Sequence, residues 1–154
     1  MTAGQVGNIG ACMISLEMAQ KLKDAGLVWQ PAKGDQFVVP GGGLDEQVFL
    51  LSDMAIIIES LKGHPAVTFH GTPEWASDYV FVVDTLWLPN ESQLRLQVQQ
   101  RLAEAGAPVF DLLFADGMYT CRFEDRGQAL AFRAEDAAEA YAQALLHLLS
   151  ANDE

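Results

Sequence analysis

Apolar and polar residues alternate over residues 109–133 with a period of two, which is typical of β-strands with one buried face. The dipeptides Asp116-Gly117 and Arg126-Gly127 interrupt this alternation, and two-residue loops at both predict a three-stranded antiparallel meander. Both turns place the same apolar set on one face, which we expect to be buried. This set is Phe110, Leu112, Phe114, Tyr119, Cys121, Phe123, Leu130 and Phe132. The opposite face would carry Asp111 across from Arg122.

The apolar period changes to about 3.6 after Arg133, which predicts a helix to about residue 149. Its apolar stripe consists of Ala138, Tyr141, Ala142, Leu145, Leu148 and Leu149. Three acidic residues, Glu135, Asp136 and Glu139, lie around the first turns, where carboxylates favour the positive end of the helix dipole. We therefore expect this helix to lay its stripe on the meander.

Two further helices are indicated by residues that typically begin and end helices. Ser15 is a suitable N-cap, and Gly26 a suitable stop, for a helix over residues 16–25. Asn90 and Gly106 have the same roles for a second helix. The expected apolar faces are Leu16, Ala19 and Leu22 in the first helix, and Leu94, Leu96, Val98 and Leu102 in the second.

The middle of the chain contains short apolar runs separated by turn-forming residues. These runs predict strands at residues 36–39, 48–51, 55–59 and 66–70. Thr72-Pro73-Glu74 is a typical helix start, and we expect the helix to reach about residue 80, although residues 79–83 also fit a strand. Grouped strands favour the α+β class, with an antiparallel sheet that includes the C-terminal meander and is covered by about four helices.

Length and charge narrow the class of protein. A chain of 154 residues, half of them hydrophobic, can bury a core without disulfides or a metal. We expect residues 13–150 to form one domain, between a flexible tail at 1–12 and an acidic tail at 151–154. The net charge of −12 argues against direct nucleic-acid binding, which needs clustered Lys and Arg. No signal peptide or membrane-spanning run is evident, so we expect a cytoplasmic location.

Three short phrases carry a resemblance to known proteins. They are the segment from Met13 to Trp29, the run Gly71-Thr72-Pro73-Glu74-Trp75-Ala76, and Leu86-Trp87-Leu88-Pro89 followed by Gln93-Leu94. Together they resemble a group of small bacterial and phage proteins without an established activity, some of which carry the label of pilus assembly proteins. The resemblance implies no catalytic or ligand-binding residues, and it favours Met13 as the natural start.

Few residues suggest catalysis or metal binding. His64, His70 and Glu74 are the best metal candidates, but their spacing matches no helical pair, and we expect no metal or other cofactor. Cys121 falls on the expected buried face, which favours a core cysteine over a nucleophile. The glycine run at 41–43 lacks the Lys-Ser/Thr of a phosphate loop. The sequence therefore predicts no catalytic residues.

Aromatic residues are the better functional candidates. Trp29, Trp75 and Trp87 each lie near a proline at an element boundary. The rings either fill the edges of a small core or form a pocket or partner surface, with His70 as a further lining residue. The leading hypothesis is a non-catalytic interaction or accessory module that binds a protein partner or itself. The alternatives are an acidic decoy of a nucleic-acid-binding protein, and a small-ligand binder or enzyme with a cleft near Trp75 and Trp87.

Overall fold

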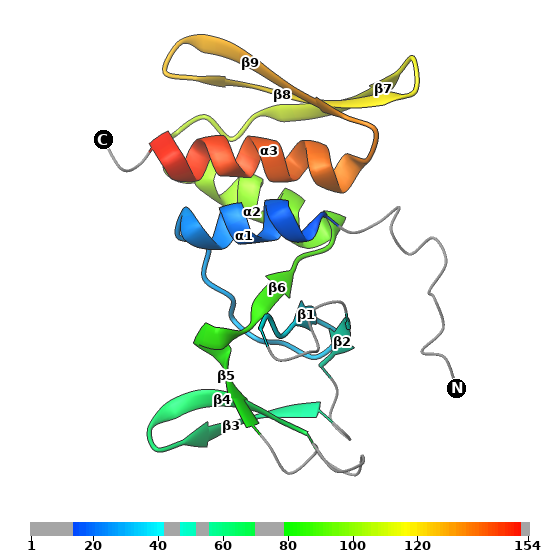
Figure 1. Cartoon of the computed structure of the whole chain (residues 1–154). Helices are drawn as coiled ribbons and strands as arrows, with labels where there is room; N and C mark the ends of the chain where they lie inside the picture. Colours follow the sequence, from blue (N-terminus) through cyan, green and yellow to red (C-terminus); the bar gives the residue numbers. More distant parts are fainter. Residues whose placement is uncertain (1–13, 42–46, 52–55, 70–78, 152–154) are drawn as a thin grey trace. The chain divides into compact units, whose positions relative to one another are not determined.

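The computed structural model describes residues 14–41, 47–51, 56–69 and 79–151. The chain divides into two compact units (Figure 1). Unit 1 comprises residues 1–27 and 89–154, and unit 2 comprises residues 28–88. The α+β class is confirmed, because both helices and antiparallel strands are present.

Unit 1 contains three α-helices and the C-terminal meander. The helices are α1 (Leu16–Asp24), α2 (Glu91–Glu104) and α3 (Ala137–Ser150). The strands are β7 (Phe110–Ala115), β8 (Met118–Asp125) and β9 (Gln128–Ala134), paired in the order β7-β8-β9. Within the described part of the chain, no helix combines the length and apolar character needed to cross a bilayer.

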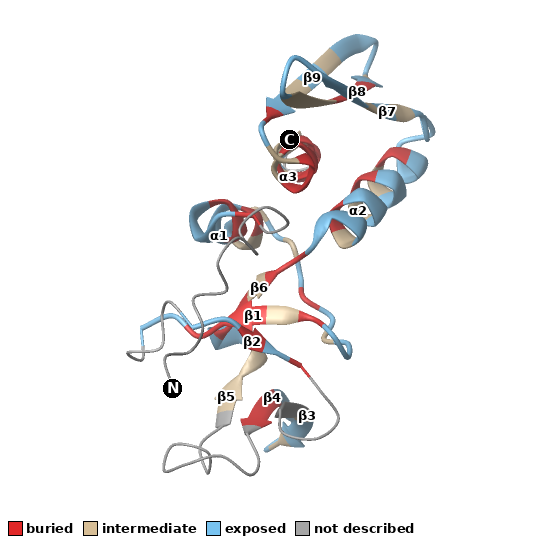
Figure 2. Cartoon of the chain, turned by 90° about the vertical axis from the view of Figure 1, so that its right-hand side faces the viewer, coloured by how far each residue is buried: buried red, intermediate tan, exposed pale blue. Residues whose placement is uncertain are grey.

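Helix α3 is the centre of unit 1. It packs against β8 and β9 on one side and against α1 and α2 on the other (Figures 1 and 2). Nine of its 14 residues are buried, which exceeds a single apolar stripe and is typical of a helix covered on more than one side. Five of the nine are alanines, whose small side chains allow close approach of neighbouring elements. The predicted stripe is confirmed, since all six of its residues are buried.

The register predicted for the meander is confirmed at both hairpins. Phe114 pairs with Tyr119 and Cys121 with Phe132, as the two-residue loops require. Both turn dipeptides have positive φ at both positions, 54° and 74° for Asp116-Gly117 and 51° and 80° for Arg126-Gly127. Positive φ at both central residues is the signature of a type I′ turn, whose twist matches that of the strands.

The prediction that one whole face of the meander is buried is correct only in part. Cys121 and Phe123 on the central strand are buried, but Phe114 on β7 is 60% exposed. The difference arises because α3 packs mainly against β8 and β9 and reaches β7 at Phe110, whose ring meets Tyr141 edge-on with centroids 6.1 Å apart, whereas Phe114 lies near the other end of β7. Period-two patterning identifies the face that points inward but not how far the covering helix reaches.

The predicted ends of the first two helices are confirmed. The Ser15 hydroxyl accepts a hydrogen bond from the Met18 N–H, and Asn90 forms a complete capping box with Gln93. Gly26 and Gly106 follow the C-caps with positive φ, and hydrogen bonds from Leu27 N–H to Leu22 C=O and from Ala107 N–H to Leu102 C=O complete Schellman motifs.

Two residues of the predicted helix faces do not belong there. Leu16 is 44% exposed and Leu96 is 50% exposed, whereas Met18 and Leu94 are buried. Each exposed leucine is two residues away from a buried residue, which is about 200° around a helix of 3.6 residues per turn. The corrected faces are therefore Met18, Ala19 and Leu22 in α1, and Leu94, Val98 and Leu102 in α2.

Unit 2 contains two small antiparallel sheets. The first has the order β2-β1-β6, formed by Phe49–Leu50, Gln36–Val38 and Leu86–Leu88. The second has the order β3-β4-β5, formed by Ile56–Leu61, His64–Phe69 and Tyr79–Phe81. A short 3-10 helix, η2 (Val82–Asp84), follows β5. Lys62 and Gly63, with φ of 53° and 81°, form the tight turn between β3 and β4.

Two details of the predicted architecture need correction. The described strands form three separate sheets rather than one, and the described α-helices number three rather than about four. The expected fourth helix was to extend to about residue 80, but residues 79–81 form strand β5, as their β-branched and aromatic side chains favour. Its expected start at Thr72-Pro73-Glu74 lies outside the described residues.

Leu145 tests the central position of α3. Its side chain is fully buried, so Leu145→Ala should lower the free energy of unfolding by roughly 2 to 5 kcal/mol through lost burial and a residual cavity. The half-exposed Leu96 provides the control, because Leu96→Ala should cost about 0.5 kcal/mol or less. Urea unfolding followed by circular dichroism measures both variants, and equal losses would contradict the central position of α3.

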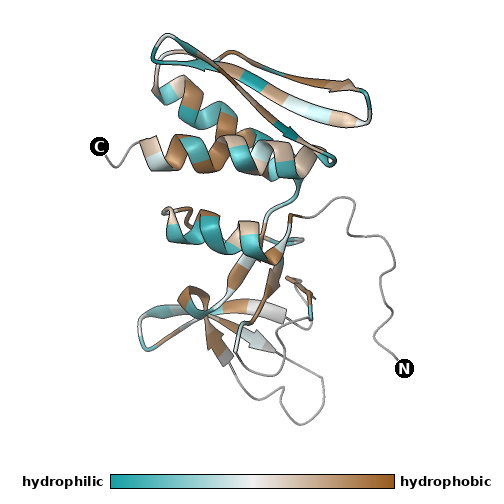
Figure 3. Ribbon diagram, turned by 45° about the horizontal axis from the view of Figure 1, so that its top comes forward, coloured by the Kyte–Doolittle hydropathy of each residue, from teal (hydrophilic) through white to brown (hydrophobic). Residues whose placement is uncertain are grey.

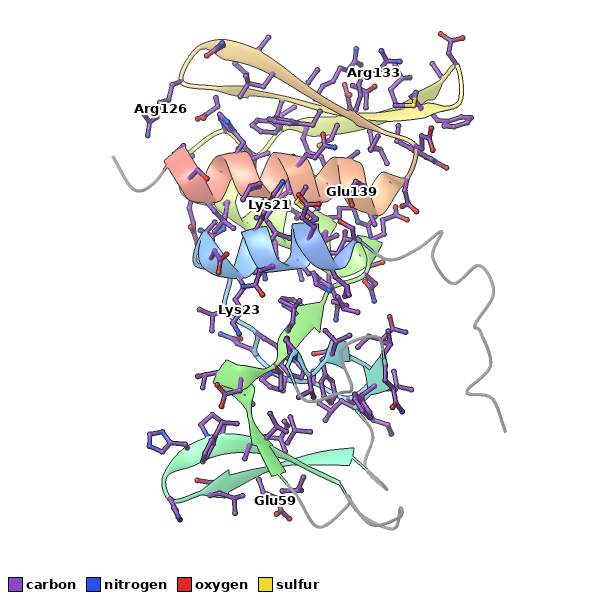
Figure 4. The ribbon with its side chains drawn as sticks, in the orientation of Figure 1. Lys21, Lys23, Glu59, Arg126, Arg133 and Glu139 are labelled. Atoms are coloured by element: carbon purple, nitrogen blue, oxygen red, sulfur yellow. The ribbon has the colours of Figure 1, made fainter. Side chains whose placement is uncertain are left out.

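Glu139 makes the stability of unit 1 depend on pH. Partial burial between α3 and α1 raises the pKa of its carboxyl group, while a hydrogen bond from the Ser15 backbone and the charge of Lys21 lower it (Figure 4). A raised pKa means that the folded state favours the neutral acid, so this stabilisation is lost as pH rises from about 4.5 through the folded pKa. Glu139→Gln removes this titration. Its stability relative to the wild type should therefore increase between pH 4 and pH 7 in urea unfolding, with exposed Glu104→Gln as the control for net charge.

Candidate functional site

Two of the four candidate residues from the sequence lie at one apolar cluster in unit 2. The cluster contains Trp29, Phe37, Val39, Phe49, Leu51 and Val67, and the partly buried Trp87 packs against it. Trp29 is 8% exposed. His70 and Trp75 lie outside the described residues, so the structure does not test the expected cleft near Trp75 and Trp87.

Trp29 is held in place by a buried carboxylate. Its indole Nε1–H donates a 2.9 Å hydrogen bond to Oδ2 of Asp35, and the backbone N–H of Ala32 donates to the same oxygen at 2.9 Å. Asp35 is 4% exposed, and a charged group at this depth needs such partners. The Trp29 ring also packs against Phe37 in a tilted arrangement, with ring centroids 5.3 Å apart. Its contacts are therefore those of a core residue.

Trp87 differs from Trp29 in the hydrogen bonding of its indole N–H. Its ring packs against the same cluster, but no described residue accepts a hydrogen bond from its buried Nε1–H. Buried indole N–H groups usually find an acceptor. Neither tryptophan presents an exposed ring of the kind that anchors an interface, and the exposed large apolar residues of the described part of unit 2 are aliphatic: Val28, Val48, Leu50 and Val83.

Cys121 has the environment of a core cysteine, as predicted. It is fully buried on β8, and burial, with a smaller contribution from the Asp111 carboxylate, raises the pKa of its thiol to about 11. A thiol with a raised pKa is a poor nucleophile near neutral pH. Cys12 lies outside the described residues.

The metal and phosphate candidates are largely outside the described part of the chain. His64 begins β4 and makes an edge contact with Phe81, with ring centroids 6.0 Å apart, whereas His70 and Glu74 are not described. Across the described ranges, no three His, Cys, Asp or Glu side chains are grouped so that they could hold a metal ion. Gly42 and Gly43 of the glycine run are also outside these ranges.

An exposed apolar surface of unit 1 lies on and beside β7. Val109 is 76% exposed, Leu113 46% and Phe114 60%, and we call these three residues the β7 strip. Hydrophobic positions follow the meander as well as the helices of unit 1 (Figure 3). The sequence carried a signal of this strip: Leu112, Leu113 and Phe114 are consecutive, so an alternating strand must place apolar side chains on both faces.

A wide, shallow groove of about 680 Å³ adjoins the β7 strip. Val109, Ala129 and Ala131 contribute apolar lining, and the charged lining residues, two of each sign, are Asp111, Glu124, Arg122 and Arg126. Asp111 and Arg122 compensate each other directly, because Arg122 Nε and Nη2 donate hydrogen bonds of 2.8 and 2.9 Å to the two Asp111 carboxylate oxygens. This contact lowers the pKa of Asp111. The groove is therefore open, mostly apolar and locally neutral.

A second hollow of about 260 Å³ lies at the C-terminal ends of α2 and α3. Arg126 Nη2 donates a 3.0 Å hydrogen bond to the Ala151 carbonyl, which is the C-cap of α3 (Figure 4). Arg101 also lines the hollow, and its Nε has no hydrogen-bond partner within the described structure. Cations are favoured at helix C-termini, so both arginines have a structural role in this position.

The Asp35 carboxylate provides a test of the unit 2 core. Asp35→Ala leaves the Trp29 indole and the Ala32 N–H without their acceptor, and the buried indole donor alone should cost roughly 1 to 3 kcal/mol. Tryptophan fluorescence during urea unfolding measures the loss, because Trp29, Trp75 and Trp87 all belong to unit 2. Asp24→Ala on α1 is the matched control and should change the fluorescence midpoint little. Equal midpoints for Asp35→Ala and the wild type would contradict the assignment.

Comparison with known proteins provides no relative from which a site could be transferred. No protein-family model, no curated protein and no solved structure matches the chain. The resemblance to small bacterial and phage proteins therefore remains a prediction from the sequence. The functional argument consequently depends on the surface of the chain itself.

Proposed function

We propose that this chain is a small cytoplasmic protein-interaction module without catalytic activity, and that it binds its partner through the β7 strip. The observation that carries the proposal is the exposure of Val109, Leu113 and Phe114 along the edge of a three-stranded sheet. Val109 and Leu113 lie on one face of this edge strand and Phe114 lies on the other, and exposed apolar residues that follow one strand, rather than being scattered singly, mark interaction sites. Neither the acidic decoy nor the ligand cleft gains a specific observation from the described residues.

The backbone of β7 adds a second source of binding energy. Among the described strands, only β8 pairs with β7, so the outer N–H and C=O groups of β7 face away from the sheet. Natural proteins commonly protect such an edge with lysine, proline or a bulge, but β7 contains neither residue type and pairs with β8 in continuous register. A partner strand can therefore extend this sheet, with main-chain hydrogen bonds providing affinity and the β7 strip providing selectivity.

A double substitution in the β7 strip tests the proposed function. Leu113→Lys with Phe114→Lys places two charges where apolar contacts are required, and should weaken partner binding by roughly 30-fold or more. The measurement is an affinity pull-down with the tagged chain from a lysate of the source cells, followed by quantitative mass spectrometry of the retained proteins. An untagged copy of the chain is added to the lysate, so that binding of the chain to itself is also detected.

The control for this experiment is Leu96→Lys, which changes a similarly exposed leucine on α2 in the same unit. We expect the wild type and the control to retain the same protein, and the double variant to lose it while its far-ultraviolet circular dichroism spectrum shows that it remains folded. Retention that does not differ between the double variant and the control, or no specific retention by the wild type, would overturn the proposal.

A further inference from the structure

The register of the meander determines which backbone groups of β7 face its free edge. A two-residue hairpin is closed by a hydrogen-bonded pair, here Ala115 and Met118, and hydrogen-bonded pairs then alternate along the strands. Leu113 and Asp111 therefore direct their N–H and C=O groups towards β8. Phe110, Leu112 and Phe114 direct theirs to the free edge, where no described strand pairs with them.

This edge is complementary to itself. The three outward-facing residues are evenly spaced, so a twofold axis through Leu112 brings Leu112 opposite its own copy and Phe110 opposite Phe114 of the other chain. All three then meet as hydrogen-bonded antiparallel pairs. We propose that the occupant of the β7 edge is a second copy of this chain, joined by antiparallel β7-to-β7 pairing centred on Leu112. This inference rests on the proposed function and specifies its partner.

The side chains agree with this pairing. Directly opposed residues of antiparallel strands point to the same face, so Phe110 of each chain packs against Phe114 of the other on the face that α3 covers. Phe114, which is 60% exposed in a single chain and lies beside Tyr119 with ring centroids 4.8 Å apart, thereby gains a second aromatic neighbour. Leu113, which is 46% exposed, lies opposite Asp111 on the other face, so no like charges are directly opposed.

Charge also favours this surface for self-association. Two chains of net charge −12 repel each other, so a contact between copies requires a surface that is locally neutral. Asp111 is the only charged residue of β7, and Arg122 of the same chain compensates it through two hydrogen bonds. The opposite edge strand, β9, carries the exposed Arg133 without an equivalent self-complementary arrangement of aromatic residues (Figure 4).

The first test measures the mass of the purified full chain by light scattering over a range of concentrations. The wild type and the Leu96→Lys control should form dimers. Phe114→Lys should raise the dimer dissociation constant by roughly 100-fold or more, because each dimer contains the substitution twice. A monomeric wild type, or a dimer that Phe114→Lys leaves intact, would overturn the inference.

The second test measures the register by disulfide cross-linking in a Cys12→Ser background, where the remaining native thiol, Cys121, is buried. Leu112→Cys should form a disulfide-linked dimer, since hydrogen-bonded pairs have Cα atoms about 5.5 Å apart, within the range of a disulfide. Phe110→Cys and Phe114→Cys should not link to themselves, because each lies about 14 Å along the strand from its own copy. A mixture of these two variants should link one to the other.

The outcomes separate this inference from the proposed function. Self-linking of Phe114→Cys, or no link with Leu112→Cys in a dimeric protein, would overturn the Leu112-centred pairing. A monomeric protein that still retains a different protein through the β7 strip would overturn the second copy as occupant and leave the proposed function standing. A monomer without any strip-dependent binding would overturn both.

Discussion

The burial of α3 on more than one side is the constraint on which unit 1 depends. The meander covers one side of the helix, and α1 and α2 cover the other. A three-stranded sheet and two short helices have little stability alone, because none can bury its apolar face without a partner. The buried alanines of α3 let these layers approach, and Leu145 fills the space between them. Removing α3 would leave each of the other layers without its core.

The same constraint explains why Phe114 is exposed. A single helix covers the width of about two strands, and α3 packs against β8 and β9. The third strand extends beyond this cover, so apolar side chains on the inward face of β7 reach solvent at Phe114. The exposure of Phe114 is therefore a consequence of pairing a three-stranded sheet with a helix that is displaced to one side, whereas Val109 and Leu113 lie on the face turned away from this helix. A surface of this origin can be used for binding without any change in the core of the unit.

Local features of unit 1 could be predicted from the sequence because they are encoded by neighbouring residues. The dipeptide Asp116-Gly117 specifies a type I′ turn, and the turn then specifies every pair in β7 and β8. Capping by Ser15 and Asn90 depends on residues three positions apart. The number of sheets and the identity of the edge strand depend on contacts between distant segments, and one sequence contains no local signal for them.

The candidate site shows the same difference between what neighbouring residues encode and what only the folded structure reveals. The buried partner of Trp29 is Asp35, six residues away across a turn, and composition alone does not distinguish this aspartate from the exposed ones. The tryptophans were candidate interface residues because large rings often anchor interfaces, but a large ring can equally fill a core. The three consecutive apolar residues at Leu112 were the more informative pattern. They are three large apolar side chains in succession, and such a break in the alternation indicates a strand with two apolar faces.

The division of the chain into units has a consequence for the order of folding. Unit 1 is discontinuous, since α1 comes from residues 16–24 and α3 from residues 137–150, and unit 2 is inserted between its two segments. During synthesis, the residues of unit 2 emerge before α2, the meander and α3. Unit 2 can therefore fold around its aromatic cluster before α3, the helix against which α1 packs, has been synthesised. A folded insertion shortens the effective loop between α1 and α2. Closing this loop when unit 1 forms therefore costs less conformational entropy than closing an unstructured loop of the same number of residues.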